Sequence, residues 1–293
     1  MAKPTILVAG STGNTGRKTV EILTSKGLPV RALVHKEDER AAALREMGAE
    51  VVLSDLLDLN SVRSALEGIR SAYFIYPIAP QLLEATAYFA LAAKEAGVEA
   101  VINMSQISAR RESRSQAALN HWAAERLFDW SGLAVTHLRP TYFAQWLIYP
   151  NFRAQILEKG QIRLPFGEGR HAPIAAEDQA RLIAAILENP HPHQGKIYPL
   201  HGPVELDQQG IADAISEVLG QDIRYQPIEL EEYKVGLRRS GRSEYLIQHL
   251  GEVALDYQKG IFAGEDNIIS QVTGTPPMTV QAFVTLHRKL FGL

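Results

Sequence analysis

The chain has 293 residues, of which 46% are hydrophobic and 22% are charged, and its net charge is −3. This length can bury a large α/β core, whereas the near-neutral charge argues against nucleic acid as a partner, because phosphate binding leaves a basic surface. The lack of cysteine excludes disulfides and thiolate chemistry, and the lack of a leader before the first strand or of an apolar run of ~18 residues predicts a cytoplasmic protein without membrane association.

Short apolar runs alternate with helical patterns over the first 140 residues. The predicted strands are Thr5–Ala9, Val30–Val34, Val51–Leu53, Ala72–Ile75, Ala100–Asn103 and Ala134–Leu138. The predicted helices between them cover residues 14–26, 37–47, 59–69, 81–96 and 115–130. This alternation indicates βαβ units, and continuously apolar strands fit a mostly parallel sheet covered on both faces. The predicted fold is therefore α/β, a Rossmann-type doubly wound parallel sheet.

The pattern loosens after about residue 140. Helices are predicted at 143–158, 176–188, 208–219, 229–239, 242–259 and 279–291, with brief strands near 196–200 and 223–227. Residues 161–171 are predicted to form a hairpin or lid beside the cleft. We expect residues 1–145 to form the sheet domain and 146–293 a smaller C-terminal α/β lobe packed on it, with no sharp boundary.

A glycine-rich loop, Gly10-Ser-Thr-Gly13-Asn-Thr-Gly16, follows the first strand and opens the first helix. In this position Gly10 permits a sharp turn, Gly13 lets the backbone approach a pyrophosphate, and Gly16 lets the helix pack close to the strand. The helix N-terminus supplies free N–H groups for the phosphates. The loop therefore predicts dinucleotide binding through Gly10, Thr12, Gly13, Asn14, Thr15 and Gly16.

The second strand ends in Val34-His35-Lys36, without the acidic residue that binds the ribose 2′-hydroxyl of NAD. His35 and Lys36 can instead neutralise the 2′-phosphate of NADP(H), so we expect NADP(H) to be preferred and NAD(H) to be tolerated. An exposed basic turn is the alternative. Asp55 could bind the adenine amino group or simply close a turn.

The same strand ends predict the rest of the cofactor cleft. Asp55-Leu56 follow the third strand, and Tyr76-Pro77 follow the fourth, where they should pass beneath the cofactor. No metal is expected, because His191-Pro-His193 has no third ligand in evidence.

Motifs spread along the chain resemble one family. They are the glycine loop, Val30–Val34, Asp55-Leu56, Asn103-Met-Ser105, residues 131–140, residues 176–180 and Thr273-Gly-Thr-Pro-Pro277. Together they resemble the NmrA-like branch of the atypical short-chain dehydrogenase/reductases, most of all its NADPH quinone oxidoreductases, triphenylmethane-dye reductases and flavin-free azoreductases. The resemblance implies a Rossmann domain with a small C-terminal lobe and a reductase that uses no flavin.

The chain departs from the ordinary superfamily pattern at the catalytic pair. None of its ten tyrosines has the Tyr-x-x-x-Lys spacing, and the aligned positions hold Ala117 and His121. His121 is therefore the candidate catalytic residue. It could bind the nicotinamide ribose or relay a proton, in which case activity should fall near the ordinary histidine pKa of about 6.5. Otherwise it faces solvent. Glu125, one turn later, could orient His121, although pairing with a neighbouring charge is favoured.

Without that pair the chain lacks a base for alcohol oxidation, and this also argues against a sugar-nucleotide epimerase or dehydratase. Electron-poor acceptors such as quinones, azo compounds and dyes accept a hydride without strong acid assistance, so positioning would dominate catalysis. Tyr142, Phe143, Trp146 and Tyr149 are candidates to stack on such an acceptor, with a place in the core as the alternative. Ser105, His121, Pro140 and Tyr142 complete the predicted nicotinamide end of the cofactor site.

The leading prediction is thus a flavin-independent NAD(P)H reductase of small aromatic acceptors. The alternative is an NADP(H)-binding redox sensor that does not turn over, as in some NmrA-like regulators. The oligomeric state, monomer or homodimer, is left open by the sequence.

Overall fold

The structure is a computed structural model that describes residues 5–292. Seven parallel strands form its main sheet, in the order β3-β2-β1-β4-β5-β6-β8. They are β1 (Ile6–Val8), β2 (Val30–Val34), β3 (Glu50–Leu53), β4 (Ser71–Phe74), β5 (Ala100–Met104), β6 (Ala134–Pro140) and β8 (Ile197–Leu200). The strand order reverses between β1 and β4, which is the point where α/β sheets of this kind bind their ligands.

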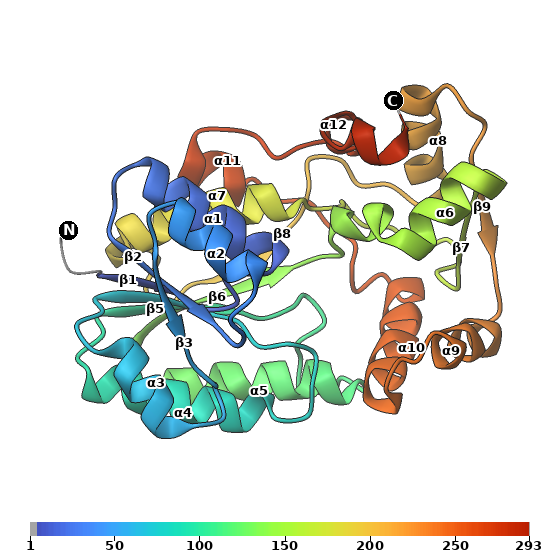
Figure 1. The fold of residues 1–293 in the computed structure, drawn as a ribbon. Helices are drawn as coiled ribbons and strands as arrows, with labels where there is room; N and C mark the ends of the chain where they lie inside the picture. The colour runs from blue at the N-terminus through green and yellow to red at the C-terminus, as the bar shows by residue number, and fades with distance from the viewer. Residues whose placement is uncertain (1–4, 293) are drawn as a thin grey trace.

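Helices cover both faces of this sheet (Figure 1). One layer holds α1 (Asn14–Ser25), α2 (Glu39–Glu46), α7 (Ala176–Glu188) and α11 (Ile268–Thr273), and the other holds α3 (Leu59–Leu66), α4 (Leu82–Glu95) and α5 (Gln116–Trp130). Successive strand residues point to opposite faces, so Tyr73 packs in one core and Phe74 in the other. The predicted doubly wound α/β fold is confirmed.

A second group of elements lies beyond the carboxyl ends of the strands (Figure 1). It comprises α6 (Pro150–Lys159), β7 (Gln161–Leu164), α8 (Gln208–Leu219), β9 (Arg224–Pro227), α9 (Leu230–Arg239), α10 (Glu244–Gln258) and α12 (Val280–Leu286). The strands β7 and β9 pair in parallel, and the group shares a separate hydrophobic core that includes Trp146, Phe166, Tyr257 and Phe283. These elements form the smaller lobe.

The chain passes between the two parts several times after residue 145. The helices α7 and α11 and the strand β8 lie after that point, yet Leu182, Leu200 and Ile269 pack in the core beneath α1. We propose that the two parts be defined by their cores, since residues 146–293 contribute to both.

Three local predictions are wrong. Residues 143–158 do not form one helix: a short 3-10 segment, Ala144–Ile148, is followed by extended Tyr149 and a new helix that starts at Pro150. Proline disfavours the helical conformation for the residue before it but fits a first helical turn. Residues 161–171 form no hairpin, because β7 pairs with β9 and His171 bridges to Leu206, while the alternative for this segment, a lid, stays a prediction. The last predicted helix, 279–291, ends at Leu286, before a 3-10 turn at Arg288–Phe291.

No helix within residues 5–292 is long and apolar enough to span a bilayer.

Candidate functional site

The glycine loop between β1 and α1 is built as its three glycines require. Gly10 has φ +60°, in the left-handed region, and a Cβ there would lie 2.6 Å from Cγ2 of Ile75. A Cβ on Gly16 would collide with the carbonyl oxygen of Gly10, so only glycine lets α1 approach the strand this closely. The N–H of Gly13 donates to that same oxygen at 2.9 Å and closes the turn.

The N-terminus of α1 is open for an anion. Gly13 is its N-cap and offers no side chain, and the first hydrogen bond of the helix runs from the N–H of Arg17 to the oxygen of Gly13 at 3.0 Å. The N–H groups of the first turn, at Asn14, Thr15 and Gly16, therefore have no partner within the helix. The turn carries no acidic residue, so its positive dipole end is not neutralised.

A cleft of about 430 Å³ lies beside this loop at the carboxyl ends of the strands. Its lining includes the predicted residues Gly10, Thr12, His35, Asp55, Leu56, Tyr76 and Pro77. Asp55 closes a turn, because its Oδ1 accepts the N–H of Leu57 at 2.9 Å, and the contact with adenine stays a prediction.

The tip of β2 carries His35 and Lys36, and the two acidic residues that follow them, Glu37 and Asp38, are engaged by other groups. His35 and Lys36 are exposed, and neither forms an ion pair with any residue between 5 and 292. Glu37 is held by Arg45 through bonds of 2.5 and 2.8 Å, while Asp38 caps α2. Of the two predicted phosphate ligands, His35 lines the cleft and Lys36 does not, and their contact with a 2′-phosphate stays a prediction.

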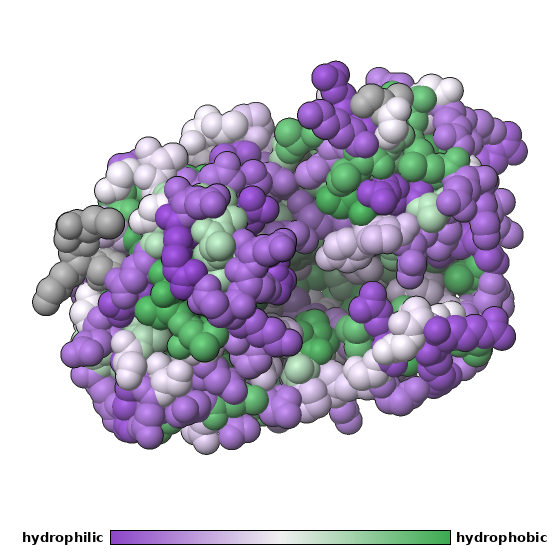
Figure 2. Space-filling view, viewed as in Figure 1, coloured by the Kyte–Doolittle hydropathy of each residue, from purple (hydrophilic) through white to green (hydrophobic). Residues whose placement is uncertain are grey.

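A second cavity, of about 400 Å³, continues the cleft beyond β4, β5 and β6 and shares Ile75, Tyr76 and Pro77 with the first. Figure 2 shows the hollow between the sheet and the lobe, with hydrophobic side chains around it. None of the eighteen described residues that line this cavity is Asp, Glu, Lys or Arg. We call it the acceptor cavity below.

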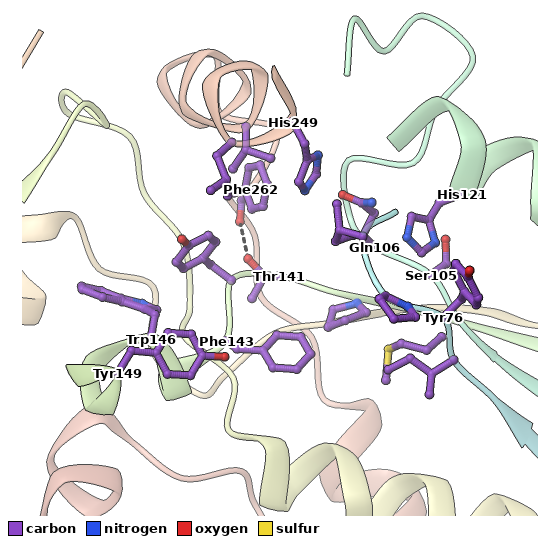
Figure 3. Close-up of a pocket in the computed structure, with 18 residues that line it drawn as sticks. Tyr76, Ser105, Gln106, His121, Thr141, Phe143, Trp146, Tyr149, His249 and Phe262 are labelled. Atoms are coloured by element: carbon purple, nitrogen blue, oxygen red, sulfur yellow. Dashed lines mark hydrogen bonds between the residues drawn. The ribbon is translucent and has the colours of Figure 1, made fainter. Parts of the chain in front are cut away.

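The four predicted stacking residues, Tyr142, Phe143, Trp146 and Tyr149, all line the acceptor cavity (Figure 3). A common helix face does not bring them there, since the chain is 3-10 and extended in this region. Instead Tyr142 meets Trp146 edge to face, with ring centroids 6.1 Å apart, and Tyr149 remains 48% exposed at the rim. The predicted residues Ser105, His121 and Pro140 line the same cavity.

Glu125 serves Ser105 and an arginine rather than His121. It is fully buried, accepts the Ser105 hydroxyl at 2.6 Å, and binds Nε and Nη2 of Arg139 at 2.8 and 2.5 Å. Pairing with a neighbouring charge, the favoured alternative, is therefore confirmed. Because its proton goes to Glu125, the Ser105 hydroxyl offers only lone pairs to a ligand.

One alternative from the sequence placed His121 in solvent. The structure instead buries it at the cavity wall, where the residue is 4% exposed. Its Nδ1 is buried without a hydrogen-bond partner in the described part of the chain. Burial, with a smaller contribution from His249, lowers the pKa of His121 to about 3. With its pKa lowered in this way, the imidazole is neutral at physiological pH, and a proton-relay role that titrates near 6.5 stays to be tested.

Sequence reasoning missed Gln106, His249 and Phe262, which also line the cavity. Gln106 directly follows Ser105 at the end of β5, so its position alone could have identified it. His249 comes from α10, more than a hundred residues downstream, and no local pattern marks it. Within residues 5–292 no three His, Asp or Glu side chains cluster to hold a metal.

The profile of the NmrA-like family matches residues 2–268 of the chain. An NAD(P)H azoreductase of Xenophilus azovorans is 31% identical over 289 residues, which are 98% of this chain and 99% of that protein. The crystal structure of an NADPH-dependent quinone oxidoreductase from Escherichia coli, complexed with NADPH, has a TM-score of 0.85 at 25% identity and covers 97% of this chain and 99% of that one.

A more distant solved structure is that of NmrA, a negative transcriptional regulator. It has a TM-score of 0.73 at 17% identity and covers 99% of this chain and 92% of that one. This similarity shows the common fold alone.

Proposed function

Because this chain belongs to the NmrA-like family, we propose that it is an NAD(P)H-dependent oxidoreductase that prefers NADPH, uses no flavin, and reduces a flat, electron-poor aromatic acceptor such as a quinone or an azo compound. One observation carries this proposal: a cavity with six Phe, Tyr or Trp rings in its wall, and no Asp, Glu, Lys or Arg among the described residues that line it, continues the cleft of the glycine loop. Such a lining fits a neutral aromatic molecule and offers a charged metabolite no partner.

The residues of the cleft divide the work of binding. The glycine loop and the first turn of α1 would hold the pyrophosphate, and His35 and Lys36 would hold the 2′-phosphate. Ser105, His121 and Pro140 would contact the nicotinamide nucleoside. When bound, NADPH supplies a hydride, which together with one proton from solvent reduces a quinone to its hydroquinone and leaves NADP⁺.

The aromatic rings would orient the acceptor. Tyr142 and Trp146 are packed edge to face and Trp146 is buried, so these rings are held in place before the acceptor arrives. Burial raises the pKa of the Tyr142 phenol well above its ordinary value, so it stays neutral. Positioning of this kind lowers the barrier by removing the entropy of encounter.

Steady-state assays of NADPH oxidation test the proposal. The purified protein is given a panel of quinones, azo dyes and triphenylmethane dyes, and NADPH and NADH binding is measured in parallel by calorimetry. We expect turnover of at least one quinone or azo compound and tighter binding of NADPH than of NADH. Tight NADPH binding without turnover of any acceptor would instead identify the sensor function.

A further inference from the structure

Two hydrogen-bond donors stand at one end of the acceptor cavity, and the first is the amide of Gln106. Its Oε1 accepts the hydroxyl of Ser108 at 2.7 Å, which fixes which way the amide points. Its Nε2 is buried and has no hydrogen-bond partner in the described part of the chain. A buried donor left without an acceptor costs about 1–3 kcal/mol of folding free energy. A ligand that accepts a hydrogen bond from this N–H group would remove that cost.

The second donor is His249, which α10 places in the same cavity. Its Nδ1 lies 2.8 Å from the hydroxyl of Ser115. That oxygen already accepts the N–H of Ala118 at 3.1 Å as the N-cap of α5, and Ser115 is 1% exposed. The described residues offer the Ser115 hydroxyl proton no other acceptor, so we assign that proton to His249 Nδ1, and this places the ring proton of a neutral His249 on Nε2.

His249 is neutral at physiological pH. It is 6% exposed, and burial lowers its pKa to about 4, partly opposed by the nearby carboxylate of Asp256. That carboxylate is itself paired with Arg110 at 2.5 and 2.7 Å. Nε2–H of His249 makes no hydrogen bond with residues 5–292, so it is free to donate into the cavity.

Both donor side chains line the acceptor cavity. In Figure 3, Gln106 stands between His249 and His121, and all three side chains reach the cavity from different elements. The loop that bears Gln106 is tied to α10 through the Arg110–Asp256 pair and the Ser115–His249 bond. This holds both donors in place without any ligand.

We propose that Nε2 of Gln106 and Nε2 of His249 form a donor pair that binds the carbonyl oxygen or azo nitrogen of the acceptor, where negative charge develops as the hydride arrives. Neutral donors held in an uncharged, partly enclosed site stabilise such a charge strongly. The donor pair thereby favours quinones and azo compounds over cationic triphenylmethane dyes, because hydride transfer to a cation neutralises its charge and develops no negative charge for the donors to stabilise. This inference rests on the proposed function, because it assigns the acceptor to this cavity.

Binding without turnover isolates the donor pair from the chemistry. The protein is loaded with NADP⁺, which has no hydride to give, and titrated by calorimetry with 1,4-naphthoquinone and with naphthalene, which has the same ring system without the carbonyls. We expect the wild-type protein to bind the quinone more tightly, and Gln106→Met and His249→Phe to weaken quinone binding while leaving naphthalene binding within about twofold.

Conservative variants separate the donor from the shape of the side chain. His249→Gln places an amide N–H near the position of Nε2 and should keep most of the quinone affinity, whereas His249→Asn, whose amide is shorter, should not. His191→Phe and Gln194→Met make the same two changes at exposed loop residues and serve as matched controls.

Turnover then tests selectivity. Gln106→Met and His249→Phe should each lower kcat for quinones and azo dyes by about 10- to 100-fold and lower it for a triphenylmethane cation less than threefold, with the NADPH dissociation constant unchanged. Equal losses for every acceptor, or weaker NADPH binding, would overturn the proposal, the latter because the donors would then hold the nicotinamide carboxamide. A wild-type protein that binds the quinone through this pair yet never reduces it would refute the reductase function and leave the donor pair standing.

Discussion

The two halves of the cleft are built in different ways. The cofactor half is made largely of backbone: one loop and the first turn of one helix present N–H groups, and three glycines keep side chains away. The acceptor half is made of side chains drawn from the ends of three strands, from α5 and from α10, so that residues from Ile75 to Phe262 meet in one cavity.

Their electrostatics differ as well. The cofactor half exposes His35 and Lys36 at the tip of β2. None of the described residues that line the acceptor cavity is Asp, Glu, Lys or Arg, and its histidines, His121 and His249, are buried and neutral. A short stretch of chain can thus supply the groups that would bind a charged cofactor. Binding of an apolar acceptor would depend instead on side chains that tertiary packing brings together. Burial of the histidines among them lowers the stability of the fold by an amount that depends on pH.

Acid should destabilise the protein through buried histidines: His121 and His249, which line the acceptor cavity, and His171, which packs beside Tyr257 in the lobe. Burial lowers the pKa of His121 and His171 to about 3 and that of His249 to about 4, while the same residues titrate near 6.5 in an unfolded chain. Below pH 6.5 the unfolded state therefore binds protons that the folded state does not. The free energy of unfolding should fall with decreasing pH by up to about 1.4 kcal/mol per pH unit for each histidine, as urea denaturation between about pH 7.5 and 5 would measure.

His171 provides a matched variant for that slope. It is fully buried beside Tyr142 and Tyr257, and neither ring nitrogen has a hydrogen-bond partner in residues 5–292. His171→Leu should make the pH dependence shallower by as much as one proton, and exposed His191→Ala should not change it. An unaltered slope in His171→Leu would show that His171 does not contribute to the pH dependence.

In the cofactor half, a side chain that keeps the cofactor away from the backbone of the glycine loop should abolish NADPH binding. Gly13 is exposed, has φ −84°, and a Cβ there would lie 3.2 Å from the oxygen of Gly10, so the chain can accept a side chain with a small shift. Gly13→Val should keep the fold but place a branched side chain where the pyrophosphate must approach. NADPH affinity measured by calorimetry should fall by more than about 100-fold, because several backbone contacts are lost together.

Gly16→Val serves as the comparison for Gly13→Val. Its Cβ would strike the backbone of Gly10 within the fold itself, so both Tm and NADPH binding should drop. If Gly13→Val also lowered Tm as much as Gly16→Val, the distinction between a cofactor glycine and a packing glycine would be wrong.

The same contrast explains what the sequence could predict. The helix at 208–219 was predicted with its observed bounds, because Asp207 caps its start and Gly220, with φ +64°, ends it. The strand Val30–Val34 was likewise defined by its apolar run and the polar residues after it. The segment 143–158 was missed because its apolar pattern continues across Pro150, where the backbone changes direction.

The residues of the site likewise differ in how far the sequence could predict them. The glycine loop is a local motif, and its turn geometry could be derived from its spacing. The position of His249 depends on the packing of α10 against the start of α5, through pairs such as Ser115–His249 that lie 134 residues apart. Gln106 depends on Ser108 for its orientation. Neither contact leaves a periodic signal in the sequence.

The preference for NADPH should reside at the tip of β2. Replacing His35 and Lys36 together with alanine removes the imidazole and the ammonium group that this tip exposes. NADPH binding should weaken by about 10- to 100-fold, as expected for charge-assisted phosphate contacts, and NADH binding should stay nearly constant. Equal losses for both cofactors in calorimetry would contradict the assignment.

The smallest effect is expected at His121, in the wall of the acceptor cavity. Its imidazole is neutral, because burial lowers its pKa to about 3, so it carries almost no proton to give at pH 7. His121→Ala should therefore raise the KM for NADPH and lower kcat less than about tenfold, whereas loss of a general acid would cost about 10²–10⁴. The pH profile of kcat between about 5.5 and 8 should also lack a histidine limb near 6.5. A hundredfold drop in kcat with NADPH affinity intact would mean that His121 donates the proton after all, and that ligand binding raises its pKa toward the working pH.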